Sequence, residues 1–387
     1  MNTAGNAAIA NEILDNPLRD LGFVAPQQPS ARWFHARLPG YAPTPLHDVP
    51  GLARRLGVGR VLVKDEATRL GLPAFKMLGA SWASYRALCE RLGREPADWQ
   101  AVSELAEAFL PLRPLTLATA TDGNHGRAVA RMAKLLGFSA RIWVPAGTAP
   151  ARVAAIESEG ASVTEIAGGY DDAVAAAAAA ADDRTLVVSD TSWEGYDRVP
   201  RFVIEGYATI LEEVDEQAAA AGIPTPDMAV VPIGVGAFAA AVAAHYRRAA
   251  GAGTELVGAE PVDAACVLKS ARSGGIVTLT EPQHSIMAGL NCGTPSPIAW
   301  PAVSKAFDRF VSVNDDQAVE AMRLLAEHGI AAGESAAAPL AALLVMQRAG
   351  SLADAADKTV LLFSTEGVTD PDFYAREVTA KLVRTAT

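Results

Sequence analysis

The sequence predicts an α/β fold made of two packed three-layer α/β domains, and three observations indicate it. Short apolar runs that favour β-strands alternate with segments of helical periodicity across short loops. This alternation occurs in two parts of the chain, before residue 190 and again after residue 214. The length of 387 residues and the hydrophobic content of 50% suffice for two domains that each bury a core. Alternating strands and helices form parallel sheets covered on both faces, which bind ligands at the carboxyl ends of their strands.

The first α/β series, residues 115–190, begins with an apolar run that ends in the turn TDGNHG. After this turn, apolar residues recur at helical spacing until Gly137, where the helix is expected to end. The expected strands are 115–120, 140–145, 161–168 and 185–190, and the expected helices are 127–137, 148–160 and 170–183. The alanine run from Ala175 to Ala181 belongs to the last helix, because alanine has the highest helix propensity.

The second series contains a strand, a glycine turn and a helix within residues 227–249, and it continues with strands at 255–260 and 359–367. No proline- or serine-rich linker separates the two series, so we expect closely packed domains with a cleft between them. Such a cleft is a usual place for a small ligand.

The glycine turn GVGAFAAAV supports more than one interpretation. Gly234, Gly236 and Ala239 fit the G-x-G-x-x-A pattern that follows a strand in dinucleotide-binding proteins. Glu260 ends the next strand, where a ribose-binding acid would stand. Alternatively, the backbone N–H groups of the turn and the start of the helix hold a phosphate on another cofactor. A tight strand-to-helix turn without a ligand would also suit the glycines.

Lys76 lies in GLPAFKMLGA, an otherwise apolar stretch that contains a turn-forming Gly-Leu-Pro. A lysine in such surroundings commonly packs its stem and extends its ammonium group to water. A partly desolvated lysine, however, loses its proton easily and can act as a Schiff-base nucleophile.

Composition narrows the partners of the protein. The formal net charge of −11 and the lack of a clustered basic segment favour a small-molecule partner over nucleic acid. No run of about 18 uncharged apolar residues occurs, and the first residues lack the basic and apolar regions of a secretory signal, so we expect no membrane partner and a cytoplasmic location. No spacing of cysteine and histidine indicates a metal site. A redox-sensitive pair of Cys266 and Cys292 stays open.

Six segments carry a resemblance to a known family. They are VLVKDEATRLGLPAFKMLGASWA, ATATDGNHGRAVARMAKLLG, SDTSWEGYDRVPRFVIEGY, GVGAFAAAV, SIMAGLNCGTPSPIAW and LLFSTEGVTDPDFY, in this order. With these motifs the chain resembles the diaminopropionate ammonia-lyases. These are fold-type II pyridoxal-phosphate enzymes of the tryptophan synthase β-like superfamily, related to threonine dehydratases and cysteine synthases. The resemblance extends over nearly the whole chain, from residue 31 to residue 374.

The resemblance implies roles for individual residues. Lys76 matches the lysine that holds the cofactor as a Schiff base, and Asn124 matches the asparagine beside the pyridine hydroxyl. The residues that match the loop for the substrate carboxylate are Thr121, Asp122, Gly123, Asn124 and His125. Those that match the phosphate-binding loop are Gly234, Val235, Gly236, Ala237 and Phe238. Either Ser364 or Thr365 matches the hydroxyl residue that faces the pyridine nitrogen.

Asp122 and Asp190 match two carboxylates of the ammonia-lyases. A carboxylate there can hold the β-ammonium group of diaminopropionate or remove a proton from the face opposite Lys76. Helix capping is the structural alternative for Asp122, and turn formation is the alternative for Asp190.

The remaining candidates have structural interpretations that we favour. We expect His125 to hydrogen-bond within its loop rather than to catalyse. Structural roles are also expected for Lys64, Asp65 and Glu66 as a solvated or ion-paired strand end, for Trp193, Tyr196 and Trp300 as packing residues, and for Glu194 as a surface or capping residue.

The resemblance implies an α,β-elimination in which Cα–H is removed, the β-amino group leaves, and hydrolysis yields pyruvate and ammonia. A dehydratase or a β-replacement enzyme on a related amino acid stays open, because Ala67, Pro73 and Ala80 depart from the family pattern. A nicotinamide-dependent oxidoreductase, which would use the glycine turn, is the weaker alternative. The implied division is a large cofactor-binding domain of residues 1–69 and 191–387 and a smaller domain of residues 70–190, in a homodimer.

Overall fold

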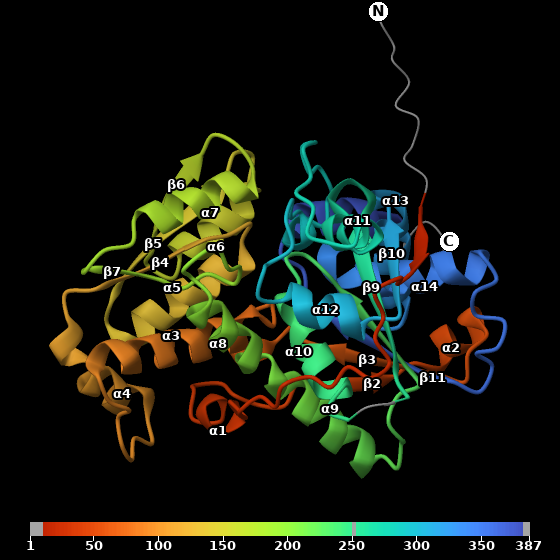
Figure 1. The fold of residues 1–387 in the computed structure, drawn as a ribbon, viewed down its shortest axis with the longest axis horizontal. Helices are drawn as coiled ribbons and strands as arrows, with labels where there is room; N and C mark the ends of the chain where they lie inside the picture. Colours follow the sequence, from red (N-terminus) through yellow and green to blue (C-terminus); the bar gives the residue numbers. More distant parts are fainter. Residues whose placement is uncertain (1–10, 250–252, 382–387) are drawn as a thin grey trace, which may run out of the picture.

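Two β-sheets organise the chain, one in each half of Figure 1. The structure, a computed structural model, describes residues 11–249 and 253–381. The larger sheet has the strand order β1-β10-β9-β8-β11-β3-β2. Its strands are β1 (Ile13–Asp15), β2 (Leu46–Asp48), β3 (Arg60–Asp65), β8 (Met228–Pro232), β9 (Glu255–Pro261), β10 (Arg309–Val313) and β11 (Thr359–Ser364). The inner strands are parallel, whereas the edge strands β1 and β2 pair antiparallel with β10 and β3.

The smaller sheet contains only parallel pairs, in the order β6-β5-β4-β7. Its strands are β4 (Thr116–Ala120), β5 (Ser139–Pro145), β6 (Ser162–Ile166) and β7 (Thr185–Val187). They fall at the predicted positions, which confirms the strands of the first series. The predicted strands of the second series are confirmed as β8, β9 and β11.

Helices cover both faces of both sheets. The first half of the chain contributes α1 (Arg32–His35), α2 (Pro50–Leu56), α3 (Lys76–Leu92), α4 (Val102–Ala108), α5 (Asn124–Leu136), α6 (Pro150–Glu157) and α7 (Tyr170–Ala179). The second half contributes α8 (Arg198–Gly206), α9 (Ala208–Ala220), α10 (Ala237–Tyr246), α11 (Cys266–Ser273), α12 (Trp300–Ala306), α13 (Asp315–Glu327), α14 (Glu334–Arg348) and α15 (Pro371–Tyr374). The alanine run is helical, as predicted, although α7 ends before its last two residues.

Alternating side chains along β8 and β11 explain why the larger sheet is covered on both faces. Val230 and Leu362 belong to the core that includes α13 and α14, whereas Val231 and Phe363 belong to the core that includes α10. Successive side chains of a strand point to opposite faces, so each strand contributes to both cores. The predicted three-layer arrangement is confirmed.

The small lobe, by which we mean the four-stranded sheet with its helices, meets the large lobe along α3 and α8 (Figure 1). α3 packs on α5 and on α8, and α8 packs on α10 of the large lobe. A Cβ atom on Gly206 would lie 2.6 Å from the backbone oxygen of Leu78, and one on Gly79 would lie 2.7 Å from the ring of Tyr207. The close crossing of α3 and α8 therefore requires both glycines.

A fully buried ion cluster lies between β3 and α9, and it corrects one expectation. Lys64 contacts Glu213 at 2.7 Å, and Arg69 contacts both Glu213 and Glu66 at 2.7 and 2.8 Å. All four side chains have 0% exposure. The solvated interpretation of Lys64 and Glu66 is thus wrong, and the ion-paired alternative is correct. The charges are tolerated because each has an opposite partner.

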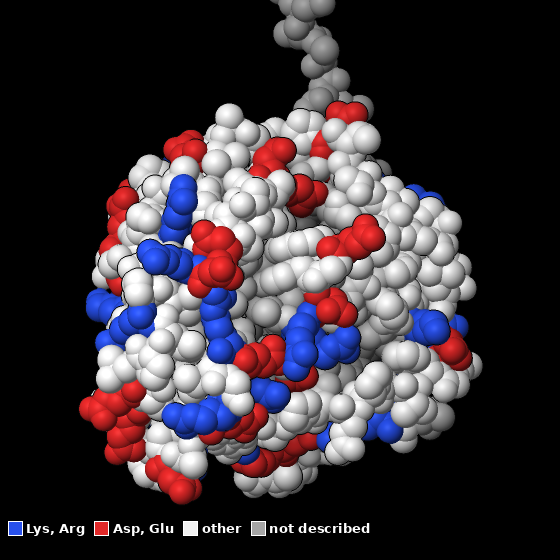
Figure 2. Space-filling model, turned by 60° about the vertical axis from the view of Figure 1, so that its left-hand side comes forward, with Lys and Arg blue, Asp and Glu red and all other residues white. Residues whose placement is uncertain are grey.

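The surface shows no continuous basic face on the side seen in Figure 2, where acidic and basic side chains are interspersed around a hollow. Within residues 11–249 and 253–381, no helix is long and apolar enough to cross a membrane.

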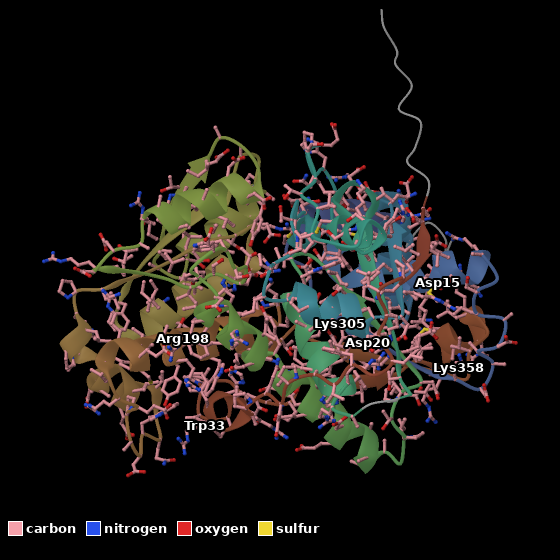
Figure 3. All side chains as sticks on the ribbon, viewed as in Figure 1. Asp15, Asp20, Trp33, Arg198, Lys305 and Lys358 are labelled. Carbon is pink, nitrogen blue, oxygen red and sulfur yellow. The ribbon has the colours of Figure 1, made fainter. Side chains whose placement is uncertain are left out.

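Trp33 is 41% exposed and lies on α1 at the lower edge of the molecule in Figure 3.

Candidate active site

The carboxyl ends of the parallel strands bring the predicted site residues together. Asp122 follows β4, Asp190 follows β7, and Gly234 follows β8. They line a common cavity, which we call the inner cavity. Of the predicted residues, those lining it are Lys76, Asp122, Asn124, Asp190, Gly234, Val235, Gly236, Ala237, Phe238 and Thr365. Thr121, Gly123, His125 and Ser364 are not among the residues that line it.

Lys76 is the first residue of α3, and its backbone is fixed against the segment that follows β11. The N–H of Phe75 donates to the carbonyl of Thr365 at 3.0 Å, and the N–H of Gly367 donates to the carbonyl of Pro73 at 2.9 Å. These two bonds join the inner cavity's lysine to the end of the large sheet. The position of the Lys76 backbone is therefore determined by both lobes.

The Lys76 ammonium forms an ion pair with Asp190, at 2.6 Å from Oδ2. The hydroxyl of Tyr170 donates to the other oxygen, Oδ1, at 2.9 Å. Burial lowers the pKa of Lys76, but the attraction of Asp190, together with Tyr207 and Asp122, outweighs it and leaves the pKa above its ordinary value. Burial likewise raises the pKa of Asp190, yet Lys76 holds it well below its usual range. In this ion-paired arrangement, Asp190 therefore stabilises the ammonium form of Lys76.

Asp122 does not cap the helix that follows it, so the capping interpretation is wrong. The N-cap of α5 is Gly123, and no side chain forms a capping hydrogen bond at this end of the helix. Burial raises the pKa of Asp122 to about 6, because Lys76 and Arg152 only partly offset the loss of hydration. A carboxyl with this pKa can take up or release a proton near neutral pH.

The loop between Asp122 and α5 is held by its own polar groups. The N–H of Gly123 donates to Thr121 Oγ1 at 2.9 Å, and Asn124 Nδ2 donates to Glu366. His125 is buried and contacts the carbonyl of Val188 through Nε2 at 2.8 Å. Because a carbonyl only accepts, this ring nitrogen donates. Burial lowers the pKa of His125, which keeps the ring neutral and fits the hydrogen-bonding role that we expect.

The glycine turn has a geometry that only glycine tolerates well. Gly236 has a φ of +96°, and a Cβ atom on Gly234 would lie 3.1 Å from both Cys292 Sγ and the carbonyl of Gly289. The turn leads into α10, whose first N–H groups have no partner within the helix. Glu260, by contrast, accepts bonds from the N–H groups of Val267 and Leu268, both at 2.8 Å. Since these bonds bury its carboxyl group, Glu260 is not free to bind a ribose.

The donor set of the cavity fits pyridoxal phosphate. It combines an amine, a glycine turn at a helix start and the hydroxyl residue Thr365. The neighbouring Ser364 does not line the cavity, but its buried Oγ has no hydrogen-bond partner among the described residues. The inner cavity encloses about 50 Å³, and the ion-paired side chains of Lys76 and Asp190 both line it.

Four further residues of the site are not predicted from the sequence: Tyr170, Arg152, Glu334 and Glu366. Arg152 Nη2 lies 3.3 Å from Glu334 Oε2 and 3.3 Å from Thr369 Oγ1, so it links α6 of the small lobe to the large lobe. Burial raises the pKa of Glu334 to about 7, and Glu366 adds to the shift. Only Glu366 had a usable signal, because it belongs to the segment STEG.

The aromatic candidates pack as expected. The rings of Trp193 and Tyr196 stack at 4.0 Å, and neither residue nor Trp300 lines the inner cavity. Glu194 is exposed. Cys266 and Cys292 are buried free thiols. No group of His, Cys, Asp or Glu suited to a metal ion occurs in the part of the chain that the structure describes.

The fold and this donor set define a class of protein. The family described as pyridoxal-phosphate dependent enzyme matches residues 37–365, and the chain belongs to this family. Within it, the chain is 38% identical over 370 residues to diaminopropionate ammonia-lyase of Escherichia coli (strain K12), covering 92% of each chain.

Solved structures give the same grouping. The holo form of diaminopropionate ammonia-lyase from Escherichia coli has a TM-score of 0.88 and 36% identity, with 96% of this chain and 97% of that chain covered. A complex of that enzyme with an aminoacrylate-PLP azomethine reaction intermediate has a TM-score of 0.87 and 36% identity, with 97% and 98% covered. The chain is therefore a fold-type II pyridoxal-phosphate enzyme, as its sequence predicts.

Proposed function

We propose that this protein eliminates ammonia from 2,3-diaminopropionate and that pyruvate and ammonia are the products. The relatives that support the proposal are the ammonia-lyases at 36% and 38% identity, which cover about nine-tenths of the chain. The net reaction takes up one water and releases both nitrogens as ammonia.

The charge balance of the site is the observation that carries the choice of substrate. Four carboxylates lie in or beside the inner cavity: Asp190, Glu334 and Glu366 are buried, and Asp122 is half-buried. The cations that face them are Lys76 and Arg152. An excess of buried negative charge is costly unless a cation neutralises it. Diaminopropionate brings a second ammonium group, whereas serine and threonine bring a neutral hydroxyl.

We assign the first steps to two residues on either side of the substrate. Bound pyridoxal phosphate supplies an electron sink for the bond that breaks at Cα. Lys76, released from the cofactor as a free amine, lies at the floor of the cavity and moves the proton at Cα on its side. Asp190 holds the Lys76 ammonium while the proton resides there. Tyr170 keeps the second oxygen of Asp190 occupied and so fixes the carboxylate.

Asp122 acts either on the leaving group or on the face of the substrate opposite Lys76. Its carboxylate either pairs with the β-ammonium group of the substrate or takes the Cα proton on the side opposite Lys76. The loop Thr121–His125 would bind the substrate carboxylate through backbone N–H groups, and Gly234–Phe238 would bind the cofactor phosphate. Ser364 or Thr365 would face the pyridine nitrogen: Thr365 lines the inner cavity, whereas Ser364 has an unpartnered Oγ.

The remaining organisation is also a proposal. We divide the chain into a large domain of residues 1–69 and 191–387 and a small domain of residues 70–190, which agrees with the membership of the two sheets. We further propose a homodimer, to be measured by light scattering coupled to gel filtration. The free thiols support a cytoplasmic location.

A product assay tests the function. Purified holoenzyme is incubated with L- and D-diaminopropionate, serine, threonine and acetylserine, and pyruvate or the corresponding oxoacid is measured. We expect kcat/KM for at least one diaminopropionate enantiomer to exceed that for every hydroxyamino acid. A preference for serine or threonine would make the protein a dehydratase and would contradict the proposal.

A further inference from the structure

A second and larger cavity lies directly outside the inner one. This outer cavity encloses about 870 Å³ and shares Asp122 and Tyr170 with the inner cavity. A volume of this size is near the upper end of the roughly 300–1,000 Å³ that accommodate drug-sized ligands. Asp122 lines both cavities, so when it pairs with the β-ammonium group, the leaving group of the substrate points toward the outer cavity.

The charged groups of the outer cavity are almost all acidic. Its lining carboxylates are Asp122, Asp171, Asp172, Glu281, Glu334 and Asp370. Arg152 is the one lysine or arginine among the described lining residues, and it is already bound to Glu334 and Thr369. The walls therefore favour a cation over a neutral or anionic group.

Glu334 is the carboxylate of this wall that is best placed to receive a cation. Its side chain is only 4% exposed, and its ion pair with Arg152 has one contact, at 3.3 Å, rather than the two of a bidentate pair. The carboxyl group of Glu366 lies close enough to raise the pKa of Glu334. Arg152 is thus shared among several acids and neutralises none of them fully.

We propose that the outer cavity is a subsite for an ammonium-bearing arm on the leaving nitrogen, so that the enzyme also cleaves N3-substituted 2,3-diaminopropionates, with Glu334 as a specificity-determining residue. This inference rests on the proposed function and extends its substrate class from diaminopropionate to its N3-aminoalkyl derivatives.

The extended reaction keeps the chemistry of the simple one. The Cα–H bond and the bond from Cβ to the secondary amine break, and a double bond forms between Cα and Cβ. The amine leaves with the electron pair of the broken bond and takes up a proton. One water then hydrolyses the remaining unsaturated amine, so that the products are pyruvate, ammonia and a primary alkylamine. No oxidant or reductant is required.

Three substrates of similar size and different charge test the proposal. They are 2,3-diaminopropionates that carry a 2-aminoethyl, a 2-hydroxyethyl or a carboxymethyl group on N3. Pyruvate and the released amine are both quantified with the holoenzyme. We expect kcat/KM for the aminoethyl compound to exceed that for the hydroxyethyl compound about tenfold, which is the factor that about 1.4 kcal/mol supplies, and the carboxymethyl compound to be slowest. Equal or inverted values would overturn the proposal.

Two variants separate the subsite from general damage. Glu334→Gln should lower kcat/KM for the aminoethyl compound at least tenfold more than for diaminopropionate itself. Glu320→Gln is the matched control, because Glu320 lies on α13, pairs with Arg348 and lines neither cavity. If Glu334→Gln lowers kcat/KM for both substrates by the same factor, Glu334 does not bind the ammonium-bearing arm and the proposal is wrong.

A binding measurement gives a readout that does not depend on turnover. The α-methyl derivatives of diaminopropionate and of its aminoethyl analogue have no Cα–H and cannot eliminate. Calorimetry should give a lower Kd for the analogue with the arm, and Glu334→Gln should remove the difference. If diaminopropionate is itself not a substrate, the proposed function fails. If it is a substrate but the arm adds neither rate nor affinity, only the subsite fails.

Discussion

The substitution Asp122→Asn tests the charge argument most directly. It removes one negative charge and keeps the size of the side chain. Two unit charges about 4 Å apart interact by about 4 kcal/mol at the effective dielectric constant of a partly buried site. Allowing for partial screening, we expect a loss of roughly 2–4 kcal/mol in transition-state binding of diaminopropionate. This corresponds to a fall of about 30- to 1,000-fold in kcat/KM.

The comparison substrate makes the test specific. D- and L-serine lack the β-ammonium group, so their kcat/KM should fall less than tenfold in the same variant unless Asp122 also serves as the base for one enantiomer. A loss confined to one enantiomer of both substrates would identify the base role. Asp316→Asn, on the exposed start of α13, is the matched control and should behave as wild type.

The pH dependence provides the second half of the assay. The pKa of Asp122 is raised to about 6, so the carboxyl loses its proton as the pH rises through that value. kcat/KM for diaminopropionate should therefore rise with pH on an acid limb near 6, and Asp122→Asn should lack this limb. The reasoning is refuted if diaminopropionate and serine lose activity equally and the acid limb persists in the variant.

Three further predictions concern the cofactor and the fold. Purified protein should be yellow, and borohydride reduction should attach the cofactor covalently to Lys76. Lys76→Ala should lose this covalent attachment. Recovery of the attached cofactor on another residue would contradict the assignment. Arg69→Met should destabilise the protein by about 3–5 kcal/mol in denaturant titrations, because it leaves the buried carboxylate of Glu66 without an ion pair and Glu213 with Lys64 alone. Glu216→Ala, at an exposed pair with Arg32, should cost less than about 1 kcal/mol. The pKa of Glu260 is raised from 4.5 to about 8, so the unfolded chain releases this proton first and stability falls as pH rises between these values; Glu260→Gln should lack that slope, and parallel curves for variant and wild type would refute it.

The sequence was informative wherever the decisive signal is local. Strands, helices and the glycine turn of both series depend on periodicity and turn residues that are close together in the chain. The convergence of Asp122 and Asp190 also follows locally, because each comes directly after a parallel strand of the same sheet. The edge strands β1 and β2 were missed, since each has three residues and β1 pairs with a strand almost 300 residues away.

The missed residues show why the rest could not be predicted. Arg152 lies on a short helix, and its sequence context is typical of a solvated charge. Its partner Glu334 could not be inferred, because it is 182 positions away in the chain. Lys64 was misjudged for the same reason, since Glu213 lies 149 positions further along the chain. The residues next to a charged side chain in the sequence do not indicate which distant residue will form an ion pair with it. Long-range ion pairs therefore need the folded structure, or a resemblance that supplies it.

The buried ion cluster around Arg69 and the backbone bonds beside Lys76 together bear on the two roles that we propose for this lysine. The buried cluster anchors Arg69, and backbone bonds join Pro73 to Gly367 and Phe75 to Thr365. On its other side, Lys76 is the first residue of α3. The backbone of Lys76 is therefore held from both directions, and only its four-carbon stem is free to move. In the mechanism that we propose, the stem would exchange its partner, from the cofactor to Asp190, without any change in the fold. A lysine on a mobile loop would have to order its backbone at each exchange, at a cost of about 1–2 kcal/mol per residue. Under the proposed mechanism, the rigid support of Lys76 would let the same amine anchor the cofactor and move a proton in successive steps.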